Sequence, residues 1–228
     1  MRTKVLLCAA ALAASLASSV AQNVYSLNVV GYVNVTLPSH QFAAVANPLD
    51  ASLGGTVAGG NDITNLFQGV AASSTLATFN SALNDYDTPI TFSGKSGAWT
   101  GNFSMPPGKG ALYFNNGAAD TVVTFVGQVQ QGAYTAASIA SHTFQLAGSP
   151  VPLGGDLSDL NTKLGLVPSA GDTVALFNSA ANDWTTPVTW SAKSSAWTGT
   201  LPIAPGAGFL YFNNSASANT WVSNFTVQ

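Results

Sequence analysis

The residues of this chain with the clearest chemical potential are aromatic side chains beside amides and carboxylates. Trp184 follows Asn182 and Asp183 directly, and Trp190 stands a little further along. An exposed indole can pack on the C–H face of a sugar ring while polar neighbours bind its hydroxyls. These four residues, Asn182, Asp183, Trp184 and Trp190, therefore form a candidate glycan site, with Trp184 and Trp190 expected to be exposed.

Two other tryptophans favour a structural interpretation. Trp99 and Trp197 occupy equivalent positions, each followed by Thr-Gly. Large aromatic side chains dominate the cores of small β domains. We expect Trp99 and Trp197 to be core residues.

A catalytic reading rests only on aspartates, because the chain contains no Glu. Glycoside hydrolysis requires a pair of carboxylates, which here must be two Asp. Asp85 and Asp183 recur at equivalent places next to an aromatic residue, and Asn-Asp before a strand is ordinary turn chemistry. An Asp-dependent hydrolase is thus the third-ranked function, and no catalytic residue is assigned.

The two histidines, His40 and His142, also occupy equivalent positions. A stable zinc site needs three or four ligands, and acidic companions at matching positions are not evident. We expect polar turn residues, no metal site and no cofactor.

Several of these candidate residues occur twice because the sequence itself contains an internal repeat. The motif Phe-Asn-Ser-Ala, the sequence Ala-Trp-Thr-Gly and the run Leu-Tyr-Phe-Asn-Asn each occur twice, 98 residues apart, and Ser-His recurs at a spacing of 102. Such self-similarity indicates a repeated structural unit. We predict an all-β fold of two tandem antiparallel β-sandwich-like units of about 100 residues, residues 22–130 and 131–228, each with about seven strands and at most one short helix.

The opening segment shows the strand pattern most clearly. From Tyr25 to Leu37 every odd position is apolar except Gly31, which predicts a strand with one buried face. Gly31 suggests a bulge or a close backbone approach. The similar sequence around Gly127 suggests a strand that both units share. Asp156, followed by spaced leucines, predicts a short capped helix.

Residues 1–21 read as a secretory signal, with a basic start, an apolar run and small residues up to Ala21. Its removal would leave four Lys, nine Asp, no Arg and no Cys, a net charge of −5. This composition disfavours nucleic acid and anionic membranes as partners, because both need clustered cations. We expect an exported protein with no membrane insertion, in the periplasm, on the cell surface or in the medium.

Four segments carry a resemblance to known proteins: the opening run 29–38, Ala46-Asn47-Pro48-Leu49, the strand 125–129 and Gly171-Asp172-Thr173-Val174. Together they resemble a group of uncharacterised exported β-repeat proteins of planctomycete- and verrucomicrobium-like bacteria. The chain departs from their pattern at residues 107–111, where they carry an acidic residue between glycines and then paired aromatics. The resemblance implies export and a β-rich repeat, without implying a chemistry.

Taken together, the sequence favours a secreted or cell-envelope structural or interaction protein without catalytic activity. Its terminal strands, 28–37 and 220–228, carry no charge, and uncharged strand edges favour pairing with another chain. Self-association through sheet edges is the expected partnership. The alternative is a carbohydrate-binding module that binds a glycan through its exposed aromatics.

Overall fold

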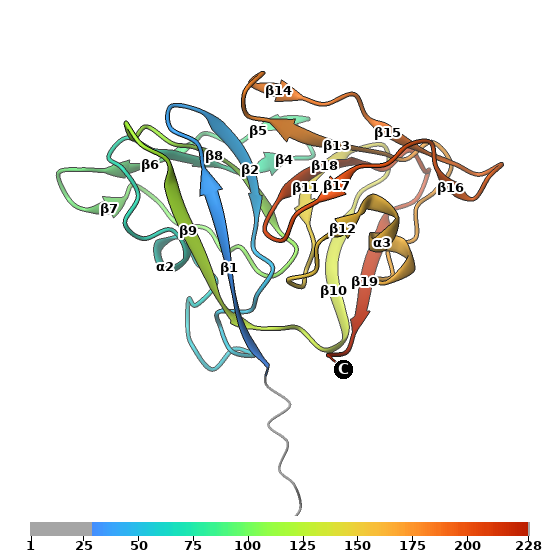
Figure 1. Cartoon of the computed structure of the whole chain (residues 1–228), viewed down its shortest axis with the longest axis horizontal. Coiled ribbons are helices and arrows are strands. Elements are labelled where there is room, and N and C mark those ends of the chain that lie inside the picture. The colour runs from blue at the N-terminus through green and yellow to red at the C-terminus, as the bar shows by residue number, and fades with distance from the viewer. Residues whose placement is uncertain (1–28, 228) are drawn as a thin grey trace, which may run out of the picture.

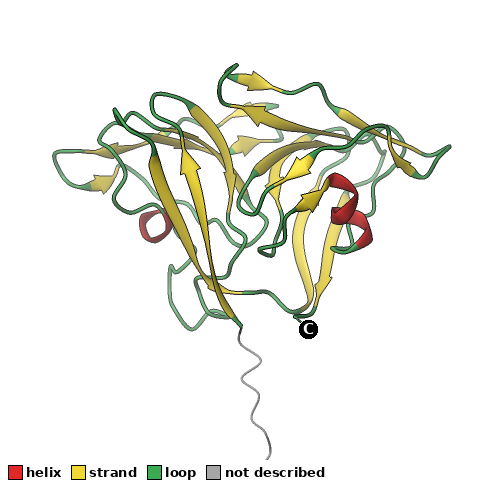
Figure 2. Ribbon diagram, viewed as in Figure 1, coloured by secondary structure: helices red, strands yellow, loops and turns green. Residues whose placement is uncertain are grey.

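The computed structural model describes residues 29–227, which we divide for description into a first half, 29–130, and a second half, 131–227. It is nearly all β-structure in several antiparallel sheets, with two short helices among the described residues (Figure 2). The all-β prediction is confirmed, whereas the division into two sandwich-like units stays a prediction. The predicted signal, residues 1–21, lies outside the described residues. No helix within 29–227 is long and apolar enough to cross a membrane.

The first half contains a five-stranded sheet, a long two-stranded ribbon, a small hairpin and a helix. Its elements are β1 (Val30–Leu37), β2 (Phe42–Ala46), α2 (Ile63–Leu66), β3 (Thr75–Ala77), β4 (Phe79–Asn80), β5 (Asp85–Tyr86), β6 (Ile90–Ser93), β7 (Ala98–Trp99), β8 (Gly110–Phe114) and β9 (Thr121–Gln128). The sheet has the order β2-β8-β3-β6-β7, β1 pairs with β9, and β4 pairs with β5.

The second half repeats this plan (Figure 1). Its elements are β10 (Gly132–Ile139), β11 (Phe144–Gly148), β12 (Gly155–Asp156), α3 (Leu157–Thr162), β13 (Thr173–Asn178), β14 (Asp183–Trp184), β15 (Val188–Ser191), β16 (Ala196–Trp197), β17 (Pro202–Ile203), β18 (Gly208–Phe212) and β19 (Asn219–Phe225). The sheet order is β11-β18-β13-β15-β16, with β14 on β13, β10 paired with β19, and β12 paired with β17.

The β1–β9 ribbon follows from the alternation in the sequence. Val33 and Leu37 on β1 are buried, whereas Val30 and Tyr32 face outward. A period of two places successive side chains on opposite faces of a strand, so one face reaches the core and the other reaches solvent. The predicted capped helix is also present, since Asp156 forms a capping box at the start of α3.

Gly31 lies directly opposite Gly127 in the ribbon, whose register has no shift. The bulge expected at Gly31 is therefore absent, and a Cβ there would make ordinary contacts. The close approach occurs at Gly127 instead, where a Cβ would lie 2.5 Å from the carbonyl carbon of Asp50. This space allows Asp50 and Gln128 to exchange two backbone hydrogen bonds of 2.8 and 2.9 Å.

The interpretation of the Gly127 segment as a strand shared by both units is wrong. The strand that contains it, β9, pairs only with β1, and the second half begins its own ribbon at Gly132. The sequence spacings explain this arrangement, because 102 residues separate Val30 from Gly132 and 98 residues separate Thr121 from Asn219. Each half thus has its own entrance and exit strands.

The two halves join through matched backbone hydrogen bonds. Ala46 N donates to Gly206 O at 2.9 Å. Gly148 N donates to Gly108 O, also at 2.9 Å. Ala46 is the counterpart of Gly148, and Gly108 is the counterpart of Gly206. Exchanging the halves therefore maps one bond onto the other, so a pseudo-two-fold axis relates them.

Ala46 and Gly148 meet at this axis. A Cβ on Gly148 would lie 2.2 Å from the Cβ of Ala46 and 2.9 Å from the carbonyl oxygen of Ala207. The flanking glycines are tight as well, since a Cβ at Gly208 would lie 2.9 Å from Val45 N. With the backbones this close, the buried apolar residues of both halves form one continuous core.

We predict that Gly148→Ala destabilises the protein by about 1–3 kcal/mol, the usual cost of forcing an extra methyl into a packed interior. Chemical denaturation at neutral pH measures the change. Gly199→Ala is the matched control, because its added Cβ would lie 3.7 Å from Val188 in ordinary contact. Equal stability of the two variants would contradict a close-packed axis.

Candidate functional site

The structure brings together three of the four candidate glycan residues. Asn182 is exposed in the turn between β13 and β14, with a φ of 52°, and Asp183 is exposed at the start of β14. The Asp183 carboxylate accepts a 2.7 Å hydrogen bond from Trp184 N, which fixes the turn. Trp184 is half-buried rather than exposed, because its indole packs edge-on against Phe177 with ring centroids 5.3 Å apart.

Trp184 lines a groove between the two halves. This hollow of about 250 Å³ is lined by Phe42, Tyr86, Leu112, Phe177, Asn182, Asp183 and Trp184. Tyr86 and Trp184 are repeat counterparts, so the pseudo-two-fold axis places the same position of each half on opposite sides of one groove. Burial raises the pKa of Tyr86, an effect that Trp184 partly offsets. Sequence reasoning missed this partnership, although the 98-residue spacing pointed to Tyr86.

Trp190, the fourth candidate, lies elsewhere. It is half-buried and packs edge-on against Trp197, with centroids 5.4 Å apart. Both rings line a hollow of about 330 Å³ between α3 and the β15–β16 hairpin. The Trp197 indole N–H donates to Asn161 Oδ1 at 3.1 Å, which connects the hairpin to the helix. The four candidates therefore divide between two separate places.

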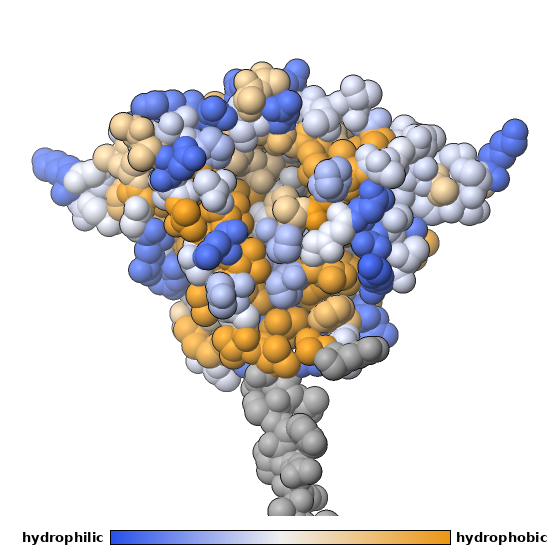
Figure 3. All heavy atoms as spheres, in the orientation of Figure 1, coloured by the Kyte–Doolittle hydropathy of each residue, from blue (hydrophilic) through white to orange (hydrophobic). Residues whose placement is uncertain are grey.

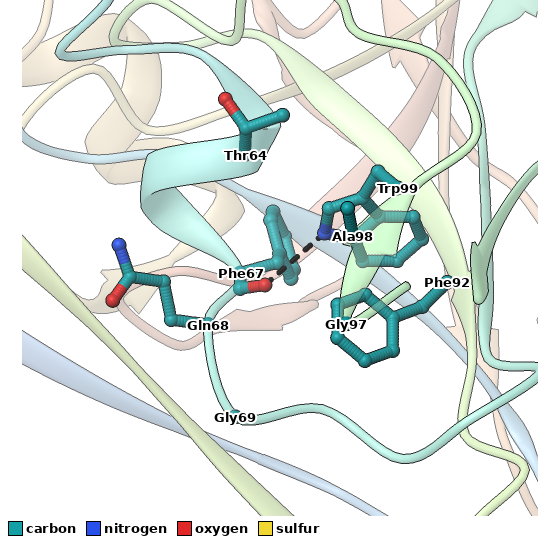
Figure 4. A pocket seen from close by; sticks show the side chains of 8 residues that line it. All are labelled: Thr64, Phe67, Gln68, Gly69, Phe92, Gly97, Ala98 and Trp99. Atoms are coloured by element: carbon teal, nitrogen blue, oxygen red, sulfur yellow. Dashed lines mark hydrogen bonds between the residues drawn. The ribbon is translucent and has the colours of Figure 1, made fainter. Parts of the chain in front are cut away.

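The first half has a hollow of about 300 Å³ in the matching place, between α2 and the β6–β7 hairpin. Figure 4 shows Phe92 and Trp99 on one side of it and Thr64 and Gln68 on the other. The Trp99 indole N–H donates to Phe67 O at 3.1 Å. Trp99 and Trp197 are each only 9% exposed, as core packing requires, yet each also contributes a wall to a hollow.

The buried carboxylates are held by protein donors. Asp50 accepts bonds from the backbone N–H groups of Ser52 and Gly54, each at 2.9 Å, and from the side chains of Asn61 and Gln130. Burial by itself would raise the pKa of Asp50, but the hydrogen bonds lower it below its usual value. A general acid needs a raised pKa. The lowered pKa does not suit Asp50 to that role. Its hydrogen bonds to Ser52 and Gly54 instead fix the loop that follows it, a structural role that we call a staple.

Asp172 has a similar role in the second half. It accepts 2.7 Å bonds from the backbone N–H groups of Ser169 and Asn214, and a further bond from the Tyr211 hydroxyl. Burial raises the pKa of Tyr211, and the Asp172 carboxylate raises it further. The carboxylate thus joins two loops and a central strand.

The histidines lie in turns, where His40 and His142 both have a φ of 53°. Within residues 29–227, no three His, Cys, Asp or Glu side chains gather in a way that could hold a metal ion.

We predict that Asp50→Asn costs about 1–3 kcal/mol at pH 7, because the amide nitrogen cannot accept the hydrogen bonds that the carboxylate accepts. Because the pKa of Asp50 is lower in the folded protein than in the unfolded chain, its ionised carboxylate stabilises the fold at every pH above the ordinary Asp pKa of 3.8. This stabilisation is lost as the pH falls through the lowered pKa. The variant should therefore lose less stability than the parent in that acidic range. Denaturation at a series of pH values tests this.

Asp183→Asn is the control, since Asp183 is exposed and its carboxylate accepts a single bond, from Trp184 N. It should change stability little at pH 7. An Asp50→Asn protein as stable as the parent at neutral pH would contradict the role of Asp50 as a staple.

Comparison with family models, curated proteins and solved structures finds no match to this chain.

Proposed function

We propose that this protein is an exported structural or interaction protein, without catalytic activity, that associates with a second copy of itself through the outer face of its β1–β9 ribbon. The observation that carries the proposal is the exposure of large apolar side chains on that face. Tyr32 is 73% exposed, Val30 60%, Val122 55% and Val126 52%. The signal-like segment 1–21 supports export.

The outer face of the ribbon is continuous and uncharged. Tyr32 pairs directly with Val126 across the strands. The next outward pair is Asn34 and Thr124, whose side chains share a 2.7 Å hydrogen bond. Neither strand contains a charged residue. Apolar residues gather in the lower central part of the molecule (Figure 3), where Figure 1 places the beginning of β1 and the end of β9. Contiguous exposed apolar surface is typical of interaction sites.

A hollow of about 510 Å³ lies beside this face. It is bounded by Thr124 and Val126 of β9 and by the loop that contains Val57, itself 43% exposed. A hollow next to protruding side chains such as Tyr32 gives the face both a convex and a concave part. A surface with both parts can be complementary to itself, which a two-fold contact requires.

The lack of charge on the ribbon allows a second copy to be the partner. Net negative charge makes two copies repel each other in general, and the uncharged β1–β9 face lets them meet without bringing carboxylates together. Among the described strands, β1 and β9 pair only with each other, and Asp50 occupies part of the outer edge of β9 through its two backbone hydrogen bonds to Gln128. The contact that we propose therefore uses the face of the ribbon, not that edge.

The second half lacks an equivalent apolar face, and this difference sets the form of the assembly. Among the outward positions of β10 and β19, Val222 is the one large apolar side chain, 43% exposed, and the others are small or polar, with Asn224 at the position that corresponds to Val126. Contact between two β1–β9 faces is therefore isologous, and such a contact closes on itself as a dimer instead of extending into a filament.

We predict that the purified protein dimerises and that Val126→Lys shifts it to monomer, because association would bury an unpaired ammonium at the centre of the face. Sedimentation velocity across a concentration series measures the shift. Asn224→Lys adds the same charge at the equivalent exposed position of the second half and should leave the dimer intact. A protein that is monomeric at every concentration would overturn the proposal.

A further inference from the structure

Two hollows outside the ribbon face occupy the same place in each half. We call them the helix–hairpin pockets: one lies between α2 and β6–β7, the other between α3 and β15–β16. Phe92 corresponds to Trp190, and Trp99 corresponds to Trp197. The two halves differ in helix length, yet the volumes remain close, about 300 and 330 Å³. The hairpin wall of the pocket is therefore kept in both halves, although the helix on the opposite side differs.

We propose that the helix–hairpin pockets are a pair of binding sites for neutral sugar rings, so that one chain engages a glycan at two points. This goes beyond self-association, and it uses none of the residues of the β1–β9 ribbon. Both volumes lie at the small end of the usual range for ligand pockets, about 300–1,000 Å³, which suits one or two sugar rings better than a larger ligand.

The aromatic walls suit the C–H groups of a sugar. In each pocket two rings meet edge to face, Phe92 with Trp99 at 68° and Trp190 with Trp197 at 74°. The face of an aromatic ring carries negative charge density and attracts weakly positive hydrogens. Both indole N–H groups are already bonded to the helix side, which holds Trp99 and Trp197 in fixed orientations. The ligand therefore meets rigid walls.

The polar parts of the pockets suit hydroxyl groups. In the first half they are Thr64 and Gln68 (Figure 4). In the second half the lining includes Ser158, Asn161, Thr162 and Thr200. Hydroxyls and amides both donate and accept hydrogen bonds, as sugar hydroxyls do.

Charge narrows the choice of ligand. Neither lining contains a cation, so an anionic ligand would be buried without compensation. The single carboxylate, Asp156 in the second half, accepts bonds from the backbone N–H groups of Ser158 at 3.1 Å and Leu201 at 3.0 Å. A neutral polyhydroxylated ring is the ligand that matches both the aromatic and the polar walls.

The two pockets should differ in affinity. Trp190 offers a larger ring face than Phe92 at the same position, and only the second pocket has an Asn in its lining. We expect two binding steps per chain, with the tighter one in the second half. The repeat itself supplies conservative variants, because each half shows which aromatic residue the other can accommodate.

Isothermal titration of the purified full chain with cellohexaose, xylohexaose, mannohexaose and laminarihexaose tests the proposal. At least one probe should bind in two steps. Trp190→Phe should weaken the tighter step about tenfold, the scale of one aromatic contact. Phe92→Trp should strengthen the weaker step. On an immobilised polysaccharide, we compare the single variants Phe92→Ala and Trp190→Ala. Each should reduce retention by a larger factor than it weakens binding at its own pocket, because the two linked sites bind the polymer together.

Trp184→Ala distinguishes binding in the helix–hairpin pockets from binding at the candidate glycan residues of the groove between the halves. It removes a half-buried tryptophan from that groove and, if the sugars bind in the pockets, changes neither step. Thermal melts confirm that each variant is folded. Three results would overturn the proposal: none of the four probes binds, Trp184→Ala weakens binding as much as Trp190→Phe, or N-acetyl-tyrosine amide binds the pockets while the sugars do not.

Discussion

The close approach of Ala46 and Gly148 is the constraint on which the rest of the structure depends. Two strands can meet at the pseudo-two-fold axis only because one of them lacks a Cβ, which would otherwise lie 2.2 Å from that of Ala46. This contact permits the matched hydrogen bonds to Gly206 and Gly108 and lets the apolar interiors merge into one core. A merged core buries more apolar surface than two separate halves would bury. Burial of apolar surface is the main driving force of folding.

Each half contains a buried carboxylate, but the two carboxylates occupy positions that do not correspond in the repeat. Asp50 anchors a loop of the first half, and its counterpart is Pro152; Asp172 anchors loops of the second half, and its counterpart is Ser74. A buried carboxylate is tolerated only when several donors satisfy it. The shared strands thus provide a common frame, and these polar centres give each half its own loops.

The candidate glycan residues illustrate the limits of sequence reasoning about a site. Asn182, Asp183 and Trp184 are neighbours in sequence and remain together, because a turn places them there. Trp190 separates from them because β13 pairs with β14 at one end and with β15 at the other, which carries the two tryptophans to different hollows. Exposure was also misjudged, since edge-on ring packing half-buries Trp184 and Trp190.

Local pattern by itself determined the all-β class, the opening strand and the Asp156-capped helix, because period-two alternation and capping act between residues a few positions apart. Only the tertiary structure decided that Tyr86 faces Trp184 and that Gly127, not Gly31, admits a neighbouring backbone. Those features arise from contacts between residues far apart in sequence. Their geometry depends on how the two halves and their loops pack, which no local periodicity records.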